Sequence, residues 1–220
     1  MSPVRKRVAV LISGRGSNLQ ALIDAAGQEG FPAEVALVVS DRPDVQGLQR
    51  AERAGVERRV LVPKELGGRV AFEAALNEAL GEAAIDLICL AGFMRIFTAE
   101  FVARWEGRMI NIHPSLLPAF PGLNSHQQAL DAGVKLHGCS VHFVDVGVDS
   151  GPIIGQAAVP VLPDDNADSL ADRILTQEHR LYPRCLELIC FGDVQLRDGK
   201  AMLASSAAAK GAVLANPDAG

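Results

Sequence analysis

Short apolar runs alternate with amphipathic stretches through the first half of the chain. The apolar runs are continuous rather than alternating, which is typical of strands covered on both faces of a parallel sheet. The stretches between them carry apolar residues at helical spacing, as Phe72, Leu76 and Leu80 do. We therefore expect an open, mostly parallel, doubly wound (Rossmann-like) α/β sheet with helices on both faces. The predicted strands cover 7–13, 34–40, 57–62, 86–91 and 109–113, and the predicted helices 18–26, 46–54 and 69–80.

The second half of the chain follows a different pattern. After about residue 114, a proline-rich loop and a short helix precede two predicted strands, 140–144 and 153–161, with no clear helix between them. We interpret these strands as a hairpin that forms an antiparallel C-terminal extension of the sheet. Polar residues between 165 and 169 are N-cap candidates for a last helix, which Pro183 breaks or kinks.

Two glycines and the chain end complete the predicted organisation. Gly55 and Gly81 follow predicted helices and are C-terminal stop signals. No linker or internal repeat is evident, so we expect a single domain over residues 1–200. Alanine, serine and glycine predominate over 201–220, which predicts a flexible C-terminal tail.

Composition limits the partners and the compartment. The net charge of −5 argues against binding to nucleic acid or to anionic membranes, which usually requires a basic surface. No apolar run approaches the roughly 20 residues that span a bilayer, and the start of the chain lacks a signal peptide. We expect a cytoplasmic protein. Its cysteines show no CxxC spacing and are expected to be reduced and mostly buried: Cys89, Cys139, Cys185 and Cys190.

A glycine-containing turn directly follows the first predicted strand. Gly14 and Gly16 allow a tight turn that exposes backbone N–H groups, and Ser17 and Asn18 add donors where a helix begins. This arrangement suits a monophosphate. It is neither a GxGxxG nor a GxxxxGK[ST] sequence, which disfavours a dinucleotide or nucleoside triphosphate site. A plain strand-to-helix turn capped by Ser17 or Asn18 is the alternative.

The densest polar cluster lies at the end of the fifth predicted strand. Asn111 and His113 are two residues apart, so their side chains lie on one side of the strand, near the sheet edge where open α/β folds bind ligands. An amide beside an imidazole suits the oxyanion that forms when an amine attacks a formyl carbon. A capping or core role for His113 is the alternative.

Two later residues extend this hypothesis. His142 lies on a predicted strand, and Asp149 lies in a turn. A carboxylate near His113 would favour the imidazolium and order a water for proton transfer. Asp149 is alternatively a turn-forming residue. The spacing of the histidines and Asp149 matches no familiar metal site, so we expect no metal. Ser115 and Cys139 lack a nucleophile-elbow sequence, which weakens covalent catalysis.

Most of the chain resembles the phosphoribosylglycinamide formyltransferase family of purine biosynthesis. The order and the spacing of six segments carry the resemblance. These segments are Ile12-Ser-Gly-Arg-Gly-Ser-Asn-Leu-Gln, Leu90-Ala-Gly-Phe-Met-Arg-Ile, Asn111-Ile-His-Pro-Ser-Leu-Leu-Pro, Ser140-Val-His-Phe-Val, Asp149-Ser-Gly-Pro and Thr176-Gln-Glu-His.

The resemblance implies a folate-dependent enzyme of one-carbon metabolism. It would transfer the formyl group of 10-formyltetrahydrofolate, as cosubstrate, to the amine of glycinamide ribonucleotide by direct attack. We expect a monomer or homodimer that binds these two small molecules and neither nucleic acid nor membrane. Two departures from the family pattern, Ala119 and Asn124, lie outside the catalytic positions, and a less acidic loop at 145–148 leaves the detail of the folate contact open.

The resemblance also implies residue roles. Asn111 and His113 stabilise the oxyanion, and Asp149 assists proton transfer. Residues expected to bind the phosphate and ribose of glycinamide ribonucleotide are Gly16, Ser17, Asn18, Leu175, Thr176, Gln177 and Glu178. Residues expected to bind folate are Arg69, Met94, Arg95, Ile96, Phe97, Asn111, Asp145, Val146, Gly147, Val148 and Asp149. Taken singly, Met94 and Ile96 would be interpreted as core positions, and Arg69 and Glu178 as solvated charges; only their joint register favours binding roles.

Three other functions are alternatives. A 10-formyltetrahydrofolate hydrolase would use water in place of the amine and would not need the phosphate turn. A methionyl-tRNA formyltransferase would need an added nucleic-acid-binding domain and usually has a basic surface. A non-catalytic nucleotide-binding module would leave the conjunction of Asn111, His113 and Asp149 unexplained.

Overall fold

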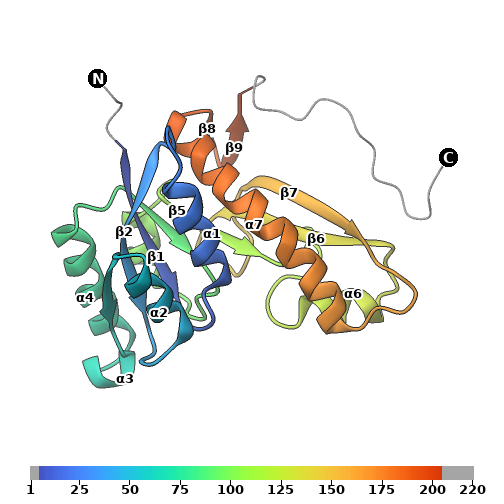
Figure 1. The fold of residues 1–220 in the computed structure, drawn as a ribbon, viewed down its shortest axis with the longest axis horizontal. Coiled ribbons are helices and arrows are strands. Elements are labelled where there is room, and N and C mark those ends of the chain that lie inside the picture. The colour runs from blue at the N-terminus through green and yellow to red at the C-terminus, as the bar shows by residue number, and fades with distance from the viewer. Residues whose placement is uncertain (1–4, 205–220) are drawn as a thin grey trace. The chain divides into compact units, whose positions relative to one another are not determined.

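The computed structural model describes residues 5–204. These residues fall into two compact units, one that ends at Asn111 and one that begins at Ile112 (Figure 1). Strand β5 (Met109–His113) crosses the boundary between them. The expectation of a single domain over 1–200 stays a prediction.

The first unit is built on a parallel sheet. Its strands lie in the order β3-β2-β1-β4-β5, and each neighbouring pair is parallel. This strand order is that of an open doubly wound sheet, in which the chain changes direction between β1 and β4. The elements of this unit are β1 (Lys6–Ile12), α1 (Ser17–Ala26), β2 (Ala33–Ser40), α2 (Gln46–Arg53), β3 (Glu57–Val60), α3 (Pro63–Leu66), α4 (Arg69–Glu82), β4 (Leu87–Leu90), α5 (Ala99–Arg104) and the start of β5.

The burial of these strands follows their place in the sheet. Residues 8–12 of β1 are completely buried, because β1 has a strand on either side and apolar side chains on both faces. All four residues of β3 are exposed. The prediction that every strand is covered on both faces is therefore wrong for β3, which is an edge strand with charged side chains.

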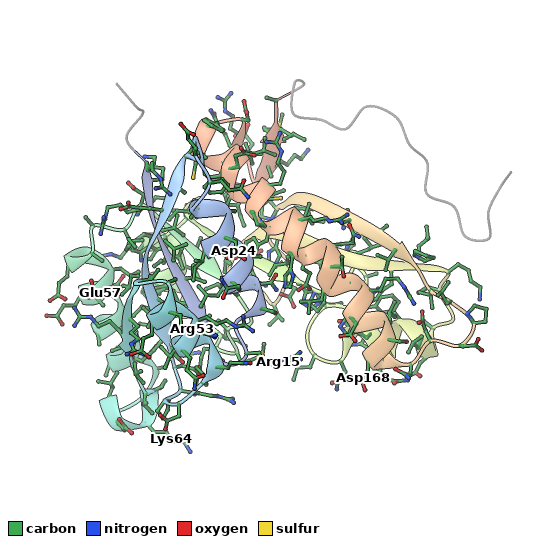
Figure 2. All side chains as sticks on the ribbon, in the orientation of Figure 1. Arg15, Asp24, Arg53, Glu57, Lys64 and Asp168 are labelled. Carbon is green, nitrogen blue, oxygen red and sulfur yellow. The ribbon has the colours of Figure 1, made fainter. Side chains whose placement is uncertain are left out.

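One of the two predicted helix stops is confirmed. Helix α2 ends just before Gly55, which has a φ of 67°, and Arg53 (labelled in Figure 2) lies in its last turn, where a cation complements the helix dipole. Gly81, in contrast, lies inside α4, so the prediction that it ends this helix is wrong. A glycine near a helix end costs only about 1 kcal/mol, and α4 continues to Glu82.

The second unit contains an antiparallel pair of strands beneath a long helix. Strands β6 and β7 pair antiparallel, which confirms the predicted hairpin. Helix α7 contacts both strands (Figure 1) and contributes Leu170 and Ile174 to a core with Cys139 and Val159. The predicted α/β class, with a mostly parallel sheet and an antiparallel C-terminal part, is confirmed. The elements are the end of β5, α6 (Ser125–Asp131), β6 (Leu136–Phe143), β7 (Ile153–Pro160), α7 (Ala167–Phe191), β8 (Val194–Arg197) and β9 (Lys200–Leu203).

Helix α7 begins and ends with clear signals. Asn166 is the N-cap and forms a capping box with Ser169, and Asp168, labelled in Figure 2, places a negative charge in the first turn. Pro183 lies inside the helix and does not end it, because the helix packs on β6 and β7 and this contact offsets one missing hydrogen bond. The helix stops before Gly192, which has a φ of 80°.

The sequence did not predict four short elements: α3, α5, β8 and β9. Ala201 to Leu203, which we assigned to the tail, pair with β8 as part of β9, so that boundary is wrong. The rest of the predicted tail, 205–220, lies outside the described residues. None of the helices within 5–204 is long and apolar enough to cross a membrane.

Candidate functional site

Two histidines and one aspartate come together in the second unit. Nδ1 of His113, at the end of β5, lies 3.2 Å from Oδ2 of Asp149. Nε2 of His142, on β6, lies 3.6 Å from Oδ1 of the same carboxylate. Both histidines are buried, and the side chain of Asp149 is only 12% exposed. The carboxylate therefore bridges two imidazole rings with little access to water.

Backbone groups of the loop after β5 complete this cluster. The carbonyl oxygen of Phe120 lies 3.0 Å from Nε2 of His113. The N–H of Gly122 donates to Oδ2 of Asp149 at 2.9 Å. Phe120 and Asp149 have positive φ values of 54° and 51°, a conformation that costs on the order of 1–3 kcal/mol. Such strain persists where surrounding contacts fix the backbone, so these groups are held in place.

The contacts favour the ionised form of Asp149. Burial raises the pKa of Asp149, but the hydrogen bond from His142, the N–H of Gly122 and the charge of His113 outweigh burial, so the pKa of this carboxyl lies below its ordinary value. His113 has an acceptor at each ring nitrogen, the Asp149 carboxylate and the Phe120 carbonyl. Only the doubly protonated imidazolium donates to both. The geometry therefore places a hydrogen-bond acceptor at each ring nitrogen of His113, beside an ionised Asp149.

The loop that carries the Phe120 carbonyl is anchored by β6 and β7. Oγ of the fully buried Ser140 donates to the carbonyl of Ser115 at 2.7 Å and accepts from the N–H of Leu117 at 3.0 Å. Nε2 of Gln156 donates to the carbonyl of Leu117 and to Oγ of Ser140, each at 2.9 Å. These bonds fix the start of the loop.

Two more histidines pack beside this loop. The rings of His126 and His137 meet edge to face with centroids 5.7 Å apart, and Phe120 packs on His137 in the same way at 5.7 Å. Burial lowers the pKa of His137 to about 4, and the nearby His126 and His113 add to this shift. Burial and His113 also lower the pKa of His126. At pH 7, neither of these two rings adds positive charge to the site.

The structure gives no support to metal or covalent chemistry at these residues. Within residues 5–204, no group of three or more His, Cys, Asp or Glu could hold a metal ion. Burial raises the pKa of the Cys139 thiol to about 12, so it is protonated and inert at neutral pH. Oγ of Ser115 donates to the carbonyl of Ala119 at 2.7 Å, which uses the hydroxyl in loop structure.

The turn between β1 and α1, in the first unit, packs against α2. Gly16 has a φ of 70°, and a Cβ on it would lie 2.7 Å from Cα of Gly47. The N–H of Gly47 donates to the carbonyl of Gly14 at 3.1 Å, and Nε of Arg50 donates to the carbonyl of Arg15 at 3.0 Å. Position 16 therefore requires glycine. The exposed side chain of Arg15 extends from this turn (Figure 2).

Helix α1 begins at Ser17, directly after this turn. Its N-cap is Gly16, which makes no side-chain capping bond, so neither Ser17 nor Asn18 occupies the N-cap position. The alternative of a turn capped by one of these two side chains is therefore wrong. Both are half-buried in the first turn of the helix, where backbone N–H groups and the helix dipole favour an anion.

The loop between β4 and α5 exposes two large apolar side chains. Met94 is 59% exposed and Ile96 61%, which rejects core positions for both. Phe93 and Phe97 are buried and stack with ring centroids 5.5 Å apart. The N–H of Met94 donates to Oγ of Ser13 at 3.0 Å. The buried phenylalanines and the hydrogen bond to Ser13 thus anchor the loop, and Met94 and Ile96 present an apolar surface that a ligand can cover.

The loop between β6 and β7 is shaped by Asp145. Its Oδ1 accepts from the N–H of Gly147 at 3.0 Å, the pattern of an Asx turn. Asp145 thus forms a turn in this loop, while the carboxylate of Asp149 contacts His113. The exposed apolar residues of the loop are Val146 and Val148.

Residues 175–178 lie within α7. Glu178 is 6% exposed, which rejects an exposed helical charge at this position. Leu175 and Gln177 are half-buried, and Thr176 is exposed and donates to the carbonyl of Asp172 at 3.2 Å. A buried carboxylate needs polar partners, so Glu178 is a better candidate for a specific contact than a solvated charge would be.

Arg69 is the first residue of α4 and is exposed. A cation at the N-terminus of a helix opposes the helix dipole. The position of Arg69 therefore does nothing for helix stability, and its side chain is accessible to an anionic ligand.

Comparison with known proteins assigns the chain to a family. The model of the formyl transferase family matches residues 6–186. The phosphoribosylglycinamide formyltransferase of Haemophilus influenzae is 42% identical over 205 residues, 93% of this chain and 97% of that protein. The crystal structure of glycinamide ribonucleotide transformylase 1 from Symbiobacterium toebii, 48% identical, superposes with a TM-score of 0.88 over 91% of this chain and 95% of that chain. The chain belongs to the phosphoribosylglycinamide formyltransferase family.

Members of this family also occur within longer proteins. The trifunctional purine biosynthetic protein adenosine-3 of Drosophila melanogaster is 56% identical over 194 residues, 87% of this chain and 14% of that protein. The chain spans only 14% to 19% of the length of such trifunctional relatives. A formyltetrahydrofolate deformylase from Pseudomonas syringae pv. tomato has the same fold with a TM-score of 0.84 but is 26% identical, over 93% of this chain and 67% of that chain. The family that the sequence resembles is thus confirmed.

The structure brings together some of the residues that the family resemblance predicts. His113 and Asp149 meet, with His142 as a third member. Asn111 is half-buried on β5 and shares a side of the strand with His113. Phe97 is buried, so its ring faces the core and only its backbone remains for a ligand. The binding roles of the other predicted residues stay predictions.

The sequence did not predict the backbone groups that contact the cluster of His113, His142 and Asp149. The Phe120 carbonyl and the Gly122 N–H contact His113 and Asp149, but main-chain groups have no side-chain signature. The available signal was the Pro121-Gly122 pair, which marks a turn. The sequence also gave no indication that the buried carboxylates of Glu73 and Asp41 contact Thr98 and Arg95 in the loop after β4.

Proposed function

We propose that this protein is a folate-dependent phosphoribosylglycinamide formyltransferase of purine biosynthesis. It transfers the formyl group of 10-formyltetrahydrofolate to the amine of glycinamide ribonucleotide, giving N-formylglycinamide ribonucleotide and tetrahydrofolate. Membership of the family supports the choice of substrates. The observation that carries the reaction class is the pair of His113 and Asp149, 3.2 Å apart. His113 of this pair lies on the same strand as Asn111.

The proposed reaction is a direct transfer. The amine nitrogen attacks the formyl carbon, a C–N bond forms, and the carbonyl oxygen becomes an oxyanion. The amide of Asn111 and the imidazolium of His113 donate hydrogen bonds to this oxyanion. Because Nε2 of His113 faces the Phe120 carbonyl, the oxyanion has to replace that carbonyl as the acceptor.

Proton transfer completes the reaction. The bond between the formyl carbon and N10 of the folate breaks, the attacking nitrogen loses a proton, and N10 gains one. Asp149 assists through an ordered water and keeps His113 in its cationic form. The lowered pKa of Asp149 supports this role, since the carboxylate is ionised at neutral pH.

The phosphate of glycinamide ribonucleotide is assigned to the turn after β1. Gly16, Ser17 and Asn18 lie at the N-terminus of α1, where N–H groups and the dipole favour a phosphate. Residues 175–178 are assigned to the same substrate, with the buried Glu178 as the partner of a ribose hydroxyl or of the amine.

The folate is assigned to exposed apolar residues and a few cations. Met94 and Ile96 on the loop after β4, and Val146 and Val148 on the loop after β6, offer apolar contacts. The backbone of Asp145 to Asp149 offers hydrogen bonds to the pterin. Arg69 and Arg95 offer positive charge to the carboxylates of the folate.

Deformylation measured by absorbance tests the reaction. Purified protein is incubated with 10-formyltetrahydrofolate, with and without glycinamide ribonucleotide. Deformylation that requires the ribonucleotide supports the transferase. Equal rates without it would establish the hydrolase, which the deformylase fold relative keeps as the second candidate. No deformylation by folded protein in either mixture would leave a binding module.

Two finer statements are also proposals. We infer a cytoplasmic enzyme that acts as a monomer or a homodimer on two small molecules. The net charge of −5 supports the expectation that neither nucleic acid nor an anionic membrane is a partner.

A further inference from the structure

The loop between β4 and α5 is held by polar side chains from three other segments of the first unit: the residue after β1, the residue after β2, and helix α4. Oγ of Ser13 accepts from the N–H of Met94 at 3.0 Å. Oε1 of the buried Glu73 accepts from the N–H of Thr98 at 2.7 Å. These two bonds fix the backbone in the middle of the loop and at its C-terminal end. A third contact, between Asp41 and Arg95, fixes a side chain instead.

Asp41 is an unusual residue for its position. It directly follows β2, and its side chain has no exposed surface. Oδ2 accepts from Nε of Arg95 at 2.6 Å, whereas Oδ1 has no hydrogen-bond partner among the described residues. A buried carboxylate with one unbonded oxygen is costly to a fold. Stability alone therefore does not explain an aspartate here.

The side chain of Arg95 is partly exposed to solvent. Its side chain is 41% exposed, and the hydrogen bond to Asp41 uses only Nε. A guanidinium is planar and carries five donors, so pairing at Nε fixes the plane while the terminal nitrogens stay available for a second carboxylate. The neighbours on either side, Met94 and Ile96, are exposed apolar residues.

This pattern matches one part of the proposed folate cosubstrate. The folate joins aromatic rings to a glutamate, whose carboxylates are its anionic groups. A cation held between two apolar side chains presents the complementary surface. We propose that Asp41 is a positioning residue for folate binding, which acts by orienting Arg95 toward a carboxylate of the cosubstrate. This inference rests on the proposed function.

Steady-state kinetics of the full chain test this role. Asp41→Asn keeps the size of the side chain and removes its charge, and Asp41→Ala removes the contact. We expect KM for 10-formyltetrahydrofolate to rise about tenfold in Asp41→Ala and less in Asp41→Asn, as for a lost charge-assisted bond. KM for glycinamide ribonucleotide and kcat should stay within about twofold, because the phosphate turn and the His113 pair do not involve Asp41.

Two further measurements separate positioning from a general loss of structure. In an Arg95→Met background, Asp41→Ala should cause no further rise in KM for 10-formyltetrahydrofolate, because the guanidinium that Asp41 orients is already absent. A formyl donor that lacks the glutamate, 10-formyltetrahydropteroate, should have the same KM with wild type and Asp41→Ala. A rise of equal size in the Arg95→Met background or with the pteroate donor would overturn the proposal, as would tighter folate binding in Asp41→Asn.

Failure of the proposed function is recognised separately. If the wild-type chain shows no deformylation that depends on glycinamide ribonucleotide, the transferase proposal fails. The role of Asp41 is then read from tetrahydrofolate binding followed by calorimetry. Weaker binding to Asp41→Ala, with unchanged binding of tetrahydropteroate, supports positioning. Unchanged binding of both, or no folate binding to wild type, rejects it.

Discussion

Nδ1 of His113 lies 3.2 Å from Oδ2 of Asp149, and the two residues come from segments more than thirty positions apart in the chain. The pair is buried, and backbone groups hold both members, the Phe120 carbonyl at the ring and the Gly122 N–H at the carboxylate. A pair fixed in this way needs little reorganisation when charge develops nearby. This is the condition under which electrostatic stabilisation contributes most to catalysis.

Removing the charge of Asp149 should therefore affect chemistry rather than binding. Asp149→Asn retains the size of the side chain and an acceptor for Gly122. We expect kcat to fall by about a hundredfold or more, the range found for lost general acid or base assistance, with KM for glycinamide ribonucleotide nearly unchanged. Asp164→Asn, a change in an exposed turn, is the matched control. A kcat within about twofold of wild type for Asp149→Asn would falsify the proposed mechanism.

The lowered pKa of Asp149 also makes a prediction about pH. The carboxylate is ionised well above its folded-state pKa, which lies below the ordinary value of 3.8. Turnover should therefore not decline through protonation of Asp149 as the pH falls from 8 to about 5. A kcat profile over this range tests the point. An acidic limb near pH 6 that Asp149→Asn abolishes would contradict the lowered pKa.

The turn after β1 predicts a contrast between two glycines. Gly16→Ala places a Cβ 2.7 Å from Cα of Gly47 at a φ of 70°, whereas a Cβ on Gly14 meets nothing within 4 Å. We expect Gly16→Ala to raise KM for glycinamide ribonucleotide about tenfold or more, because the turn must shift where the phosphate binds. Gly14→Ala should stay near wild type in the same assay. Equal effects of the two changes would show that the shape of the turn does not govern binding.

Much of this fold is predictable because local patterns and tertiary environment agree. The strand over Met109–His113 matches its predicted bounds, and the helices over residues 17–26, 46–53 and 69–82 differ by two residues or fewer at each end. The exceptions have physical reasons. Pro183 ends a helix only when no tertiary contact compensates for the lost bond, and α7 packs on two strands. We predicted that β3 is covered on both faces, but its residues are exposed. The sequence did not indicate that this strand lies at the edge of the sheet.

The candidate site is predictable to a smaller extent. Asn111, His113 and Asp149 could be selected from the sequence, since residue type and strand-end position carry the signal. The Phe120 carbonyl has no such signal, because its contact with His113 depends on a φ of 54° and on anchoring by Ser140 and Gln156. The pairing of Asp41 with Arg95 joins positions far apart in sequence, and only the packing of the sheet brings them together.

The partly buried ion pair between Arg173 and Asp165 should stabilise the second unit more than an ion pair on the surface does. Arg173 donates to both carboxylate oxygens of Asp165, at 2.7 and 2.8 Å, and the Asp165 side chain is 3% exposed. We expect Asp165→Ala to lower the free energy of unfolding by roughly 2–4 kcal/mol, as a buried partner is lost. Arg184→Ala, which removes an exposed pair with Glu187 on the same helix, should cost less than about 1 kcal/mol. Urea unfolding compares the two, and similar losses would show that burial of the pair is unimportant.

His137 predicts a pH dependence of stability. Its pKa is lowered from 6.5 to about 4, mainly by burial, while the backbone of Pro114 opposes the shift without cancelling it. The folded protein keeps this ring neutral, whereas the unfolded chain protonates it below pH 6.5, so unfolding takes up a proton between these values. The contribution of His137 is therefore complete above about pH 6.5 and is lost as the pH falls toward 4, by roughly 3 kcal/mol at about 1.4 kcal/mol per pKa unit.

Replacing the ring isolates this contribution. His137→Phe keeps an aromatic side chain beside Phe120 and His126 and removes the titratable group. We expect urea unfolding between pH 7.5 and 4.5 to show a smaller loss of stability in the variant than in wild type. The slope that remains belongs in part to His126, whose pKa is also lowered, so His126→Gln combined with His137→Phe should flatten it further. If wild type and His137→Phe lose stability in parallel, the unfolded and folded states protonate position 137 alike, and the neutral buried ring is excluded.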